Sequence, residues 1–217
     1  MNSTASSSIA VVAALFLAGP AAAQNTAVSD DHDHAHVHGS EDVRKGHFDD
    51  AQVQARELSD WEGDWQSVYP YLRNGMLAPV MEDKAAHGHK SAAEYLAYYR
   101  AGYATDVDHI VIEGDWITFG EGDASVKGRY EADGHEVLTY DAGNRGVRYV
   151  FARVEGDDAA PAVIQFSDHR IAPERSDHYH LYMGADREAL LEELTNWPTY
   201  YPADLSGEEI VDEMLAH

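Results

Sequence analysis

The feature that most constrains the fold is a series of short alternating segments between residues 107 and 184. The segments are VDHIVIE, DWITF, ASVKGRY, HEVLTY, VRYVFARV, AVIQFSDH and HYHLYM. Alternation of apolar and polar residues is typical of half-buried strands, and Gly114-Asp115, Asp133-Gly134 and Gly143-Asn144 predict the bends between them. Seven short strands joined by hairpins predict an antiparallel up-and-down barrel or sandwich. We favour the barrel because closure removes exposed strand edges.

Helices are predicted on both sides of this strand-rich region. The spacing of a capping box occurs three times, at Ser59 with Glu62, Ser91 with Glu94 and Ser206 with Glu209. The first box predicts a helix that runs to about Asn74-Gly75, with Pro70 ending or bending its regular part. Asp186 is expected to cap a helix to about Asn196, and WPTYYP at 197–202 to form an ordered connector. The fold class is therefore mainly β with added helices.

Three histidines mark the last predicted hairpin, VIQFSDHRIAPERSDHYHLYMG at 163–184. Alternate side chains of a strand point to opposite faces, so His178 and His180 share one face of the second arm. If the arms close symmetrically, His169 lies opposite His178 and diagonal to His180, about 4.5–8 Å away. Three imidazoles at such separations can converge on one divalent ion, whereas the alternative is a set of surface histidines beside a hairpin.

Composition narrows the chemistry of any metal site in this chain. The sequence has no cysteine, which excludes thiolate zinc sites, a cysteine nucleophile and a disulfide framework. Histidine, carboxylate and water remain as ligands, and this set suits zinc and related borderline ions. The formal charge of −24 argues against nucleic acid and anionic lipid as partners, and it attracts cations.

The N-terminus reads as a secretory signal at residues 1–23. An apolar run from Ile9 to Ala18, too short to span a membrane, precedes Gly19-Pro20 and three alanines. We expect cleavage after Ala23 and no membrane insertion afterwards; a retained N-terminal anchor is the alternative.

A histidine-rich segment follows, within a flexible stretch expected at residues 24–46. Its core is DDHDHAHVH at 30–38, with His32, His34, His36 and His38 between acids. Such a segment favours several weak metal sites over one rigid site, and the alternative is a solvated tail. His87 and His89 form another His-x-His pair, which we interpret as a surface loop. The single His109 and His135 are interpreted as surface or turn residues.

From about Phe48 onward the sequence resembles the ZinT (YodA-type) family of bacterial periplasmic metal-binding proteins. The resemblance is carried by FDDAQVQARELSDWEGDWQSVYPYL, YYRAGYATD, LTYDAGNRGVRYVF, IQFSDHRIAP, HYHLYMG and NWPTYYP. It implies a single lipocalin-like (calycin) domain at residues 47–217. It also implies a metal site near the barrel mouth that binds Zn²⁺ and can also bind Cd²⁺. The family's three histidine ligands correspond to His169, His178 and His180.

The resemblance further implies a non-enzymatic protein of the periplasm. Its function would be to capture zinc under scarcity and help deliver it to the substrate-binding protein of a zinc uptake ABC transporter. Two other functions remain open from the residues alone. A zinc hydrolase could use water bound by three histidines, although no HExxH or comparable motif supplies a base. A small-molecule-binding lipocalin would follow from the barrel alone.

Overall fold

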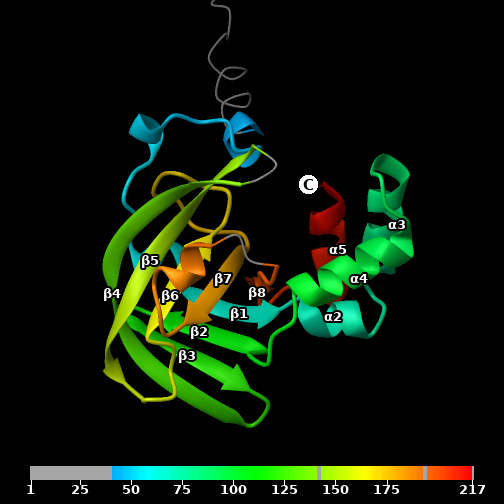
Figure 1. Ribbon diagram of the computed structural model, residues 1–217. Helices are drawn as coiled ribbons and strands as arrows, with labels where there is room; N and C mark the ends of the chain where they lie inside the picture. Colours follow the sequence, from blue (N-terminus) through cyan, green and yellow to red (C-terminus); the bar gives the residue numbers. More distant parts are fainter. Residues whose placement is uncertain (1–40, 141–142, 193–194, 217) are drawn as a thin grey trace, which may run out of the picture.

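The computed structural model describes residues 41–140, 143–192 and 195–216, and its main element is a closed antiparallel barrel (Figure 1). Its strands are β1 (Gly63–Ser67), β2 (His109–Glu113), β3 (Trp116–Glu121), β4 (Ala124–Thr139), β5 (Arg145–Gly156), β6 (Val163–Ser167), β7 (Tyr179–Gly184) and β8 (Thr199–Pro202). Each strand pairs antiparallel with the next, and β8 returns to β1. Both edges of the sheet are thereby paired, and the predicted fold class is confirmed.

The helices gather on one side of the barrel as a second lobe (Figure 1). They are α2 (Tyr69–Arg73), α3 (Ala78–His87) and α4 (Ala92–Gly102), between β1 and β2, and α5 (Gly207–Ala216), after β8. Val68, Leu77 and Ile210 belong to a core that these helices share. The two capping boxes predicted at Ser91 and Ser206 are present, each with its glutamate three residues later.

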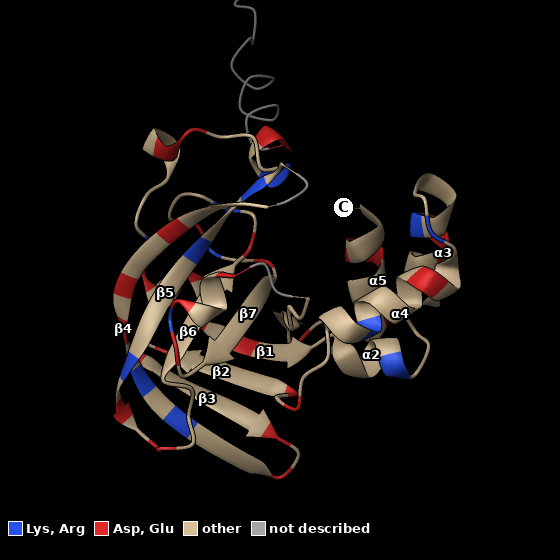
Figure 2. Ribbon diagram, in the orientation of Figure 1, with Lys and Arg blue, Asp and Glu red and all other residues tan. Residues whose placement is uncertain are grey.

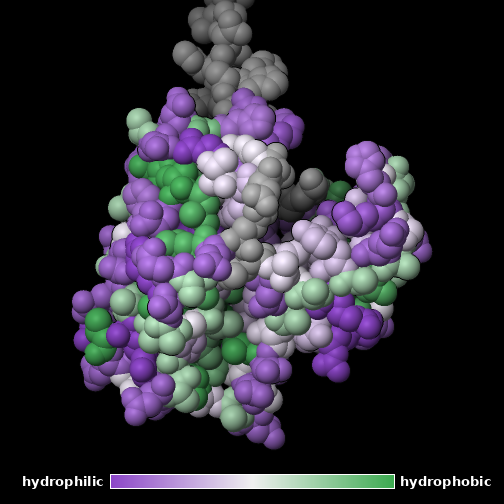
Figure 3. Space-filling view, viewed as in Figure 1, coloured by the Kyte–Doolittle hydropathy of each residue, from purple (hydrophilic) through white to green (hydrophobic). Residues whose placement is uncertain are grey.

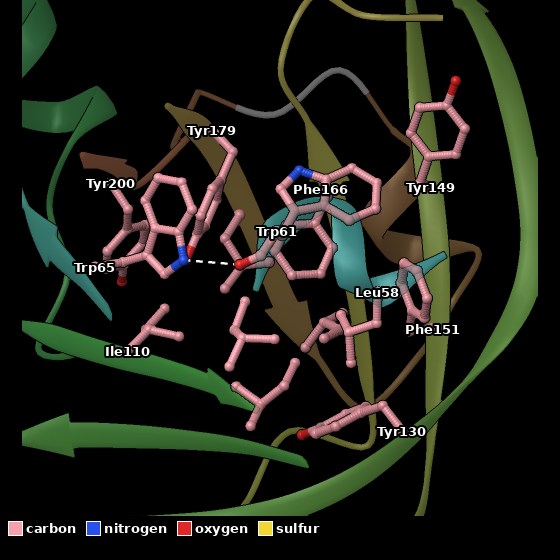
Figure 4. Close-up of a cluster of buried hydrophobic side chains, with 14 of the residues drawn as sticks. Leu58, Trp61, Trp65, Ile110, Tyr130, Tyr149, Phe151, Phe166, Tyr179 and Tyr200 are labelled. Atoms are coloured by element: carbon pink, nitrogen blue, oxygen red, sulfur yellow. Dashed lines mark hydrogen bonds between the residues drawn. The ribbon is translucent and has the colours of Figure 1, made fainter. Parts of the chain in front are cut away.

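The barrel interior is filled by large side chains (Figure 4). A 3₁₀ turn, η2 (Leu58–Trp61), places Trp61 inside the barrel, where its ring stacks on Phe166 with 4.6 Å between centroids. Trp65 of β1 donates from Nε1 to the carbonyl of Trp61 at 2.8 Å. Because Trp61, Trp65 and Phe166 are all buried, this space is a packed core.

The single helix predicted from Ser59 to about Asn74-Gly75 is wrong. The chain instead forms η2, then strand β1, then the short helix α2, with another 3₁₀ turn, η1 (Asp50–Gln52), upstream. Gly63 has a φ of +137°, which interrupts a helix at that residue. Trp61 and Trp65 have helical spacing, but they lie in two different elements, η2 and β1, and both pack in the barrel core. The backbone of β1 is held between β2 and β8.

The hairpin predicted at Asp133-Gly134 is also absent, because the two segments around it form one long strand, β4. The register with β5 shifts between Ala132 and His135, and Gly134 has a φ of +85°. These are features of a β-bulge, which bends a strand without ending it. Residues 107–184 therefore contribute six strands, and β1 and β8 complete the barrel.

The segment after β7 differs from its prediction too. Asp186 accepts a hydrogen bond from the amide of Ala189 at 2.9 Å, as a cap would, but the described helix there is only η3 (Ala189–Leu191). The predicted connector at 197–202 is ordered, and its last four residues form strand β8, which closes the barrel. A four-residue strand that follows Pro198 and ends at Pro202 is too short to show an alternation that could be recognised from sequence.

Acidic and basic residues are both distributed along the barrel strands and the helices (Figure 2). Acidic residues are the more widespread, consistent with the formal charge of −24, and basic residues occur on the long strands β4 and β5. No helix within the described ranges is both long enough and apolar enough to cross a membrane.

Candidate metal centre

The structure brings the three predicted histidines together at one end of β7. One ring nitrogen from each of His169, His178 and His180 lies within 4.8 Å of the other two. The ring centroids are 5.9 Å apart for His169 and His178, 5.5 Å for His169 and His180, and 6.1 Å for His178 and His180. Tetrahedral zinc with bonds of 2.0–2.1 Å needs ligand nitrogens about 3.4 Å apart. Small rotations of the three histidine side chains would bring their nitrogens to that separation.

The register of the last hairpin explains this proximity. Ser167 of β6 pairs with His180 of β7, so the same register continued by two residues places His169 opposite His178. Strand β6 ends at Ser167, and His169 adopts a left-handed backbone with a φ of +62°. Among the described residues it is the one non-glycine with positive φ, a conformation uncommon for such residues. The chain therefore turns sharply at the residue that carries the first imidazole.

A buried ion pair holds the residue before His169. Arg56 Nη1 lies 2.6 Å from Asp168 Oδ1, and neither side chain is exposed to solvent. The other donors of Arg56 bind Asp60 Oδ2 at 2.8 Å and the carbonyl of Glu174 at 2.7 Å. Its guanidinium also lies over the ring of Trp61, 4.0 Å from the centroid. The segment 168–174 is thus tied to the chain that precedes the barrel.

His180 is held by strand β8 and kept in the form that can bind metal. Its Nδ1 lies 2.8 Å from the hydroxyl of Thr199, the residue directly opposite on β8. The pKa of His180 is held well below its ordinary value of 6.5. The main cause is burial of the ring, and the nearby His169, His178 and Arg148 lower the pKa further. The ring is therefore neutral near pH 7, as a metal ligand must be.

Strand β8 also supports the middle histidine of the cluster. The ring of His178 stacks on Tyr201 with centroids 5.2 Å apart and an angle of 14° between planes. Thr199 and Tyr201 stand two residues apart on β8, so they project on the same side of the strand. No sequence pattern predicts a role for either residue, because the segment at 197–202 reads as a connector. Arg56 and Asp168 were missed as well, since no local pattern joins residues so far apart.

The histidines open into a cleft of about 700 Å³ between the barrel and the helical lobe. Figure 3 shows the recess between the two lobes in space-filling view. Tyr98, Tyr99 and Tyr103 line its helical side, together with Met214 of α5. A volume this large leaves the cluster open to an incoming ion and to a further ligand, unlike a closed structural zinc site.

The other histidines singled out from the sequence lie elsewhere. His87 ends α3 with its Nδ1 3.0 Å from the carbonyl of Asp83, and both His87 and His89 are exposed. His109 begins β2, and His135 lies on β4 beside Tyr149. Within the described ranges, the cluster at 169, 178 and 180 is the one group of three or more potential ligands. The histidines at 32, 34, 36 and 38 lie outside those ranges.

Several known proteins are similar to this chain in sequence. Residues 39–217 match the family described as "ZinT (YodA) periplasmic lipocalin-like zinc-recruitment". The chain is 55% identical over 179 residues to the probable metal-binding protein YrpE of Bacillus subtilis, covering 82% of this chain and 71% of YrpE. It is 48% identical over 177 residues to the zinc-binding lipoprotein AdcA of Streptococcus pneumoniae serotype 4, covering 81% of this chain and 35% of AdcA.

Two solved structures extend the comparison to three dimensions. The crystal structure of the Zn(II)-bound ZinT-like domain of Streptococcus pneumoniae AdcA matches with a TM-score of 0.77 and 47% identity, covering 80% of this chain and 97% of the domain. Zn(II)-bound AdcA itself matches with a TM-score of 0.78 and 48% identity, covering 81% of this chain and 38% of AdcA. This chain therefore spans little more than a third of AdcA. By sequence and by fold, it belongs to the ZinT family.

Proposed function

We propose that the protein captures zinc for uptake, with His169, His178 and His180 as the ligands. The observation that carries the proposal is the convergence of their ring nitrogens within 4.8 Å at an open cleft. Imidazole nitrogen is a good donor for zinc, and Zn(II)-bound structures exist for the similar AdcA domain. Cd²⁺ should compete for the same site, since it too accepts imidazole ligands.

The three-ligand geometry supports transfer of the ion. Three protein ligands leave the fourth position of a tetrahedral ion for water or an exchangeable group. The cleft gives access to that position. We infer that the site holds zinc reversibly and is suited to passing it to another protein.

The partner we propose is the substrate-binding protein of a zinc uptake transporter. Residues 1–23 would direct export of this protein, so the two proteins would meet in the periplasm. The family description names the periplasm and zinc recruitment. In AdcA a ZinT-like domain forms part of a larger zinc-binding lipoprotein, and this supports a direct link between the domain and zinc uptake.

The histidine-rich segment is proposed as an auxiliary, weaker metal site at His32, His34, His36 and His38. The first described residues after it support a location near the main site, because Glu41, Arg44 and Lys45 line the cleft. Tethering there would raise its effective concentration at the cluster.

We favour a binding protein over a zinc hydrolase because of the ion pairs in the cleft. The described acids that line it are Glu41, Asp168 and Asp177. They pair with Lys45 at 2.6 Å, Arg56 at 2.6 Å and Arg170 at 2.5 Å respectively. A carboxylate whose oxygen is engaged by a cation is not positioned to take a proton from a bound water. A lipocalin that binds small molecules inside its barrel is disfavoured because side chains fill that interior.

Chelator competition on the metal-free protein tests the proposed ligands. His178→Ala should lower zinc affinity by orders of magnitude, because two imidazoles hold the ion far less well than three. His135→Ala is the matched control and should leave affinity unchanged, since His135 lies on β4 away from the cluster. Equal and small effects from both substitutions would contradict the assignment.

A further inference from the structure

We propose that Thr199 is a positioning residue that selects which nitrogen of His180 binds the metal. The proposal rests on His180 being a zinc ligand, as proposed above. Thr199 belongs to β8, the strand that closes the barrel, and it stands directly opposite His180. Its side chain connects the imidazole to the backbone of the segment that leads into β8.

The direction of each hydrogen bond follows from the number of protons available. The hydroxyl of Thr199 lies 3.0 Å from the carbonyl oxygen of Trp197, which can only accept. The single hydroxyl proton therefore points to Trp197, and towards His180 the hydroxyl oxygen can only accept. The Nδ1 of His180, 2.8 Å away, must then carry the ring proton. A neutral imidazole with Nδ1–H has its lone pair on Nε2.

This arrangement prepares the ring for zinc before the ion arrives. Nε2 is left as the unprotonated nitrogen, and a metal ligand needs that lone pair. If Thr199 did not accept from Nδ1, the proton could occupy Nε2 and compete with the ion. Such partners commonly fix the tautomer and orientation of histidine ligands, and their loss typically costs about 10–100-fold in metal affinity.

The surroundings of Thr199 make its hydroxyl a fixed rather than a mobile partner. The residue is buried, with 2% of its surface exposed. Neighbouring strands hold it as well, because the amide of Leu181 donates to the carbonyl of Pro198 at 2.9 Å. A β-branched side chain has few rotamers, which limits rotation of the hydroxyl away from His180.

Two variants separate the role of the hydroxyl from that of packing. Thr199→Val keeps the branched shape but removes the hydroxyl, and we expect zinc affinity in chelator competition to fall about 10–100-fold. Thr199→Ser restores the hydroxyl and should return the affinity to that of the unmodified protein. A purely structural role predicts the reverse order, with valine tolerated and serine impaired, and that result would overturn the proposal.

Nitrogen NMR of the unmodified, metal-free protein tests the tautomer without any substitution at Thr199. With ¹⁵N-labelled histidine, and His180 assigned from the signals lost in His180→Gln, protonated and unprotonated ring nitrogens have well-separated shifts. We expect Nδ1 protonated and Nε2 unprotonated near pH 7. Protonation at Nε2 in a protein that still binds zinc through the three histidines would refute only the role proposed for Thr199 and would leave the proposed function standing. Loss of zinc binding by the triad itself would instead refute the proposed function.

Discussion

Arg56 and Asp168 form a fully buried ion pair across 112 positions of sequence, with 2.6 Å between Nη1 and Oδ1. The pair connects the segment before the barrel to the residue next to His169. Desolvation of two charges is costly, and additional hydrogen bonds to the pair offset part of that cost. Here Nε and Nη2 of Arg56 also have partners, in Asp60 and Glu174.

We expect Arg56→Met to be strongly destabilising. The substitution leaves the carboxylate of Asp168 buried without its cation, and breaking a buried pair in this way costs about 3–5 kcal/mol. Urea unfolding of the metal-free protein measures the loss. Arg129→Met is the matched control, because Arg129 pairs with Glu131 and Glu155 at the surface, where such pairs contribute about 0–1 kcal/mol. Similar losses for both variants would contradict the role assigned to the buried pair.

His169→Asn should separate metal binding from folding. Asparagine is one of the few residues that accept a left-handed backbone readily, so the φ of +62° at this position is retained without added strain. We expect the melting temperature of the metal-free protein to change little while zinc affinity falls by orders of magnitude. His169→Val is the comparison, since a β-branched residue is strained at positive φ and should lower the melting temperature as well.

Acidification should destabilise the metal-free protein partly through His180. Its pKa in the folded protein is held below the ordinary 6.5, first by burial and then by the neighbouring His169, His178 and Arg148. Below pH 6.5 the unfolded chain therefore binds a proton at His180 that the native state does not. Stability is complete above pH 6.5 and is lost as the pH falls toward the folded pKa. Thermal unfolding between pH 7 and pH 5 should show this loss, and His180→Gln should reduce its slope.

Deleting residues 30–38 should lower the total number of zinc ions bound but keep one tight site. The histidines at 169, 178 and 180 are held by the β6–β7 hairpin, whereas the polar, repetitive sequence at 30–38 predicts a segment that must lose chain entropy whenever it wraps an ion. Calorimetric titration of the deletion variant against the same chain with residues 30–38 intact measures both quantities. If tight binding disappears, the segment supplies an essential ligand and the three-histidine site is incomplete.

Patterns confined to a few neighbouring residues predicted their part of this protein well. The alternation at 163–184 and the spacing of His169, His178 and His180 predicted a hairpin that gathers three imidazoles, and the structure places them together. The capping boxes at Ser91 and Ser206 likewise predicted α4 and α5. In each case the interacting residues are close in sequence, so their geometry follows from strand or helix periodicity.

Local patterns failed where distant pairing outweighed them. Residues 59–75 have helical spacing at Trp61 and Trp65, yet β1 forms because β2 and β8 hold its backbone. Asp133-Gly134 has the composition of a hairpin turn, yet β4 continues through it as a bulge against β5. Intrinsic preferences amount to a fraction of a kcal/mol per residue, so the pairing of a closed sheet readily overrides them.

The sequence alone was enough to predict the class of fold, the exclusion of thiolate ligands and the three histidines that the last hairpin would gather. Which residues hold those histidines, and what the histidines face, depends on contacts between distant parts of the chain. Arg56 meets Asp168 only when the chain before the barrel packs against the residues that follow β6. Thr199 and Tyr201 meet His180 and His178 only when β8 pairs with β7. The cleft exists only because the helical lobe lies beside that strand. These contacts join residues far apart in the chain, and no local periodicity encodes which distant segments will meet.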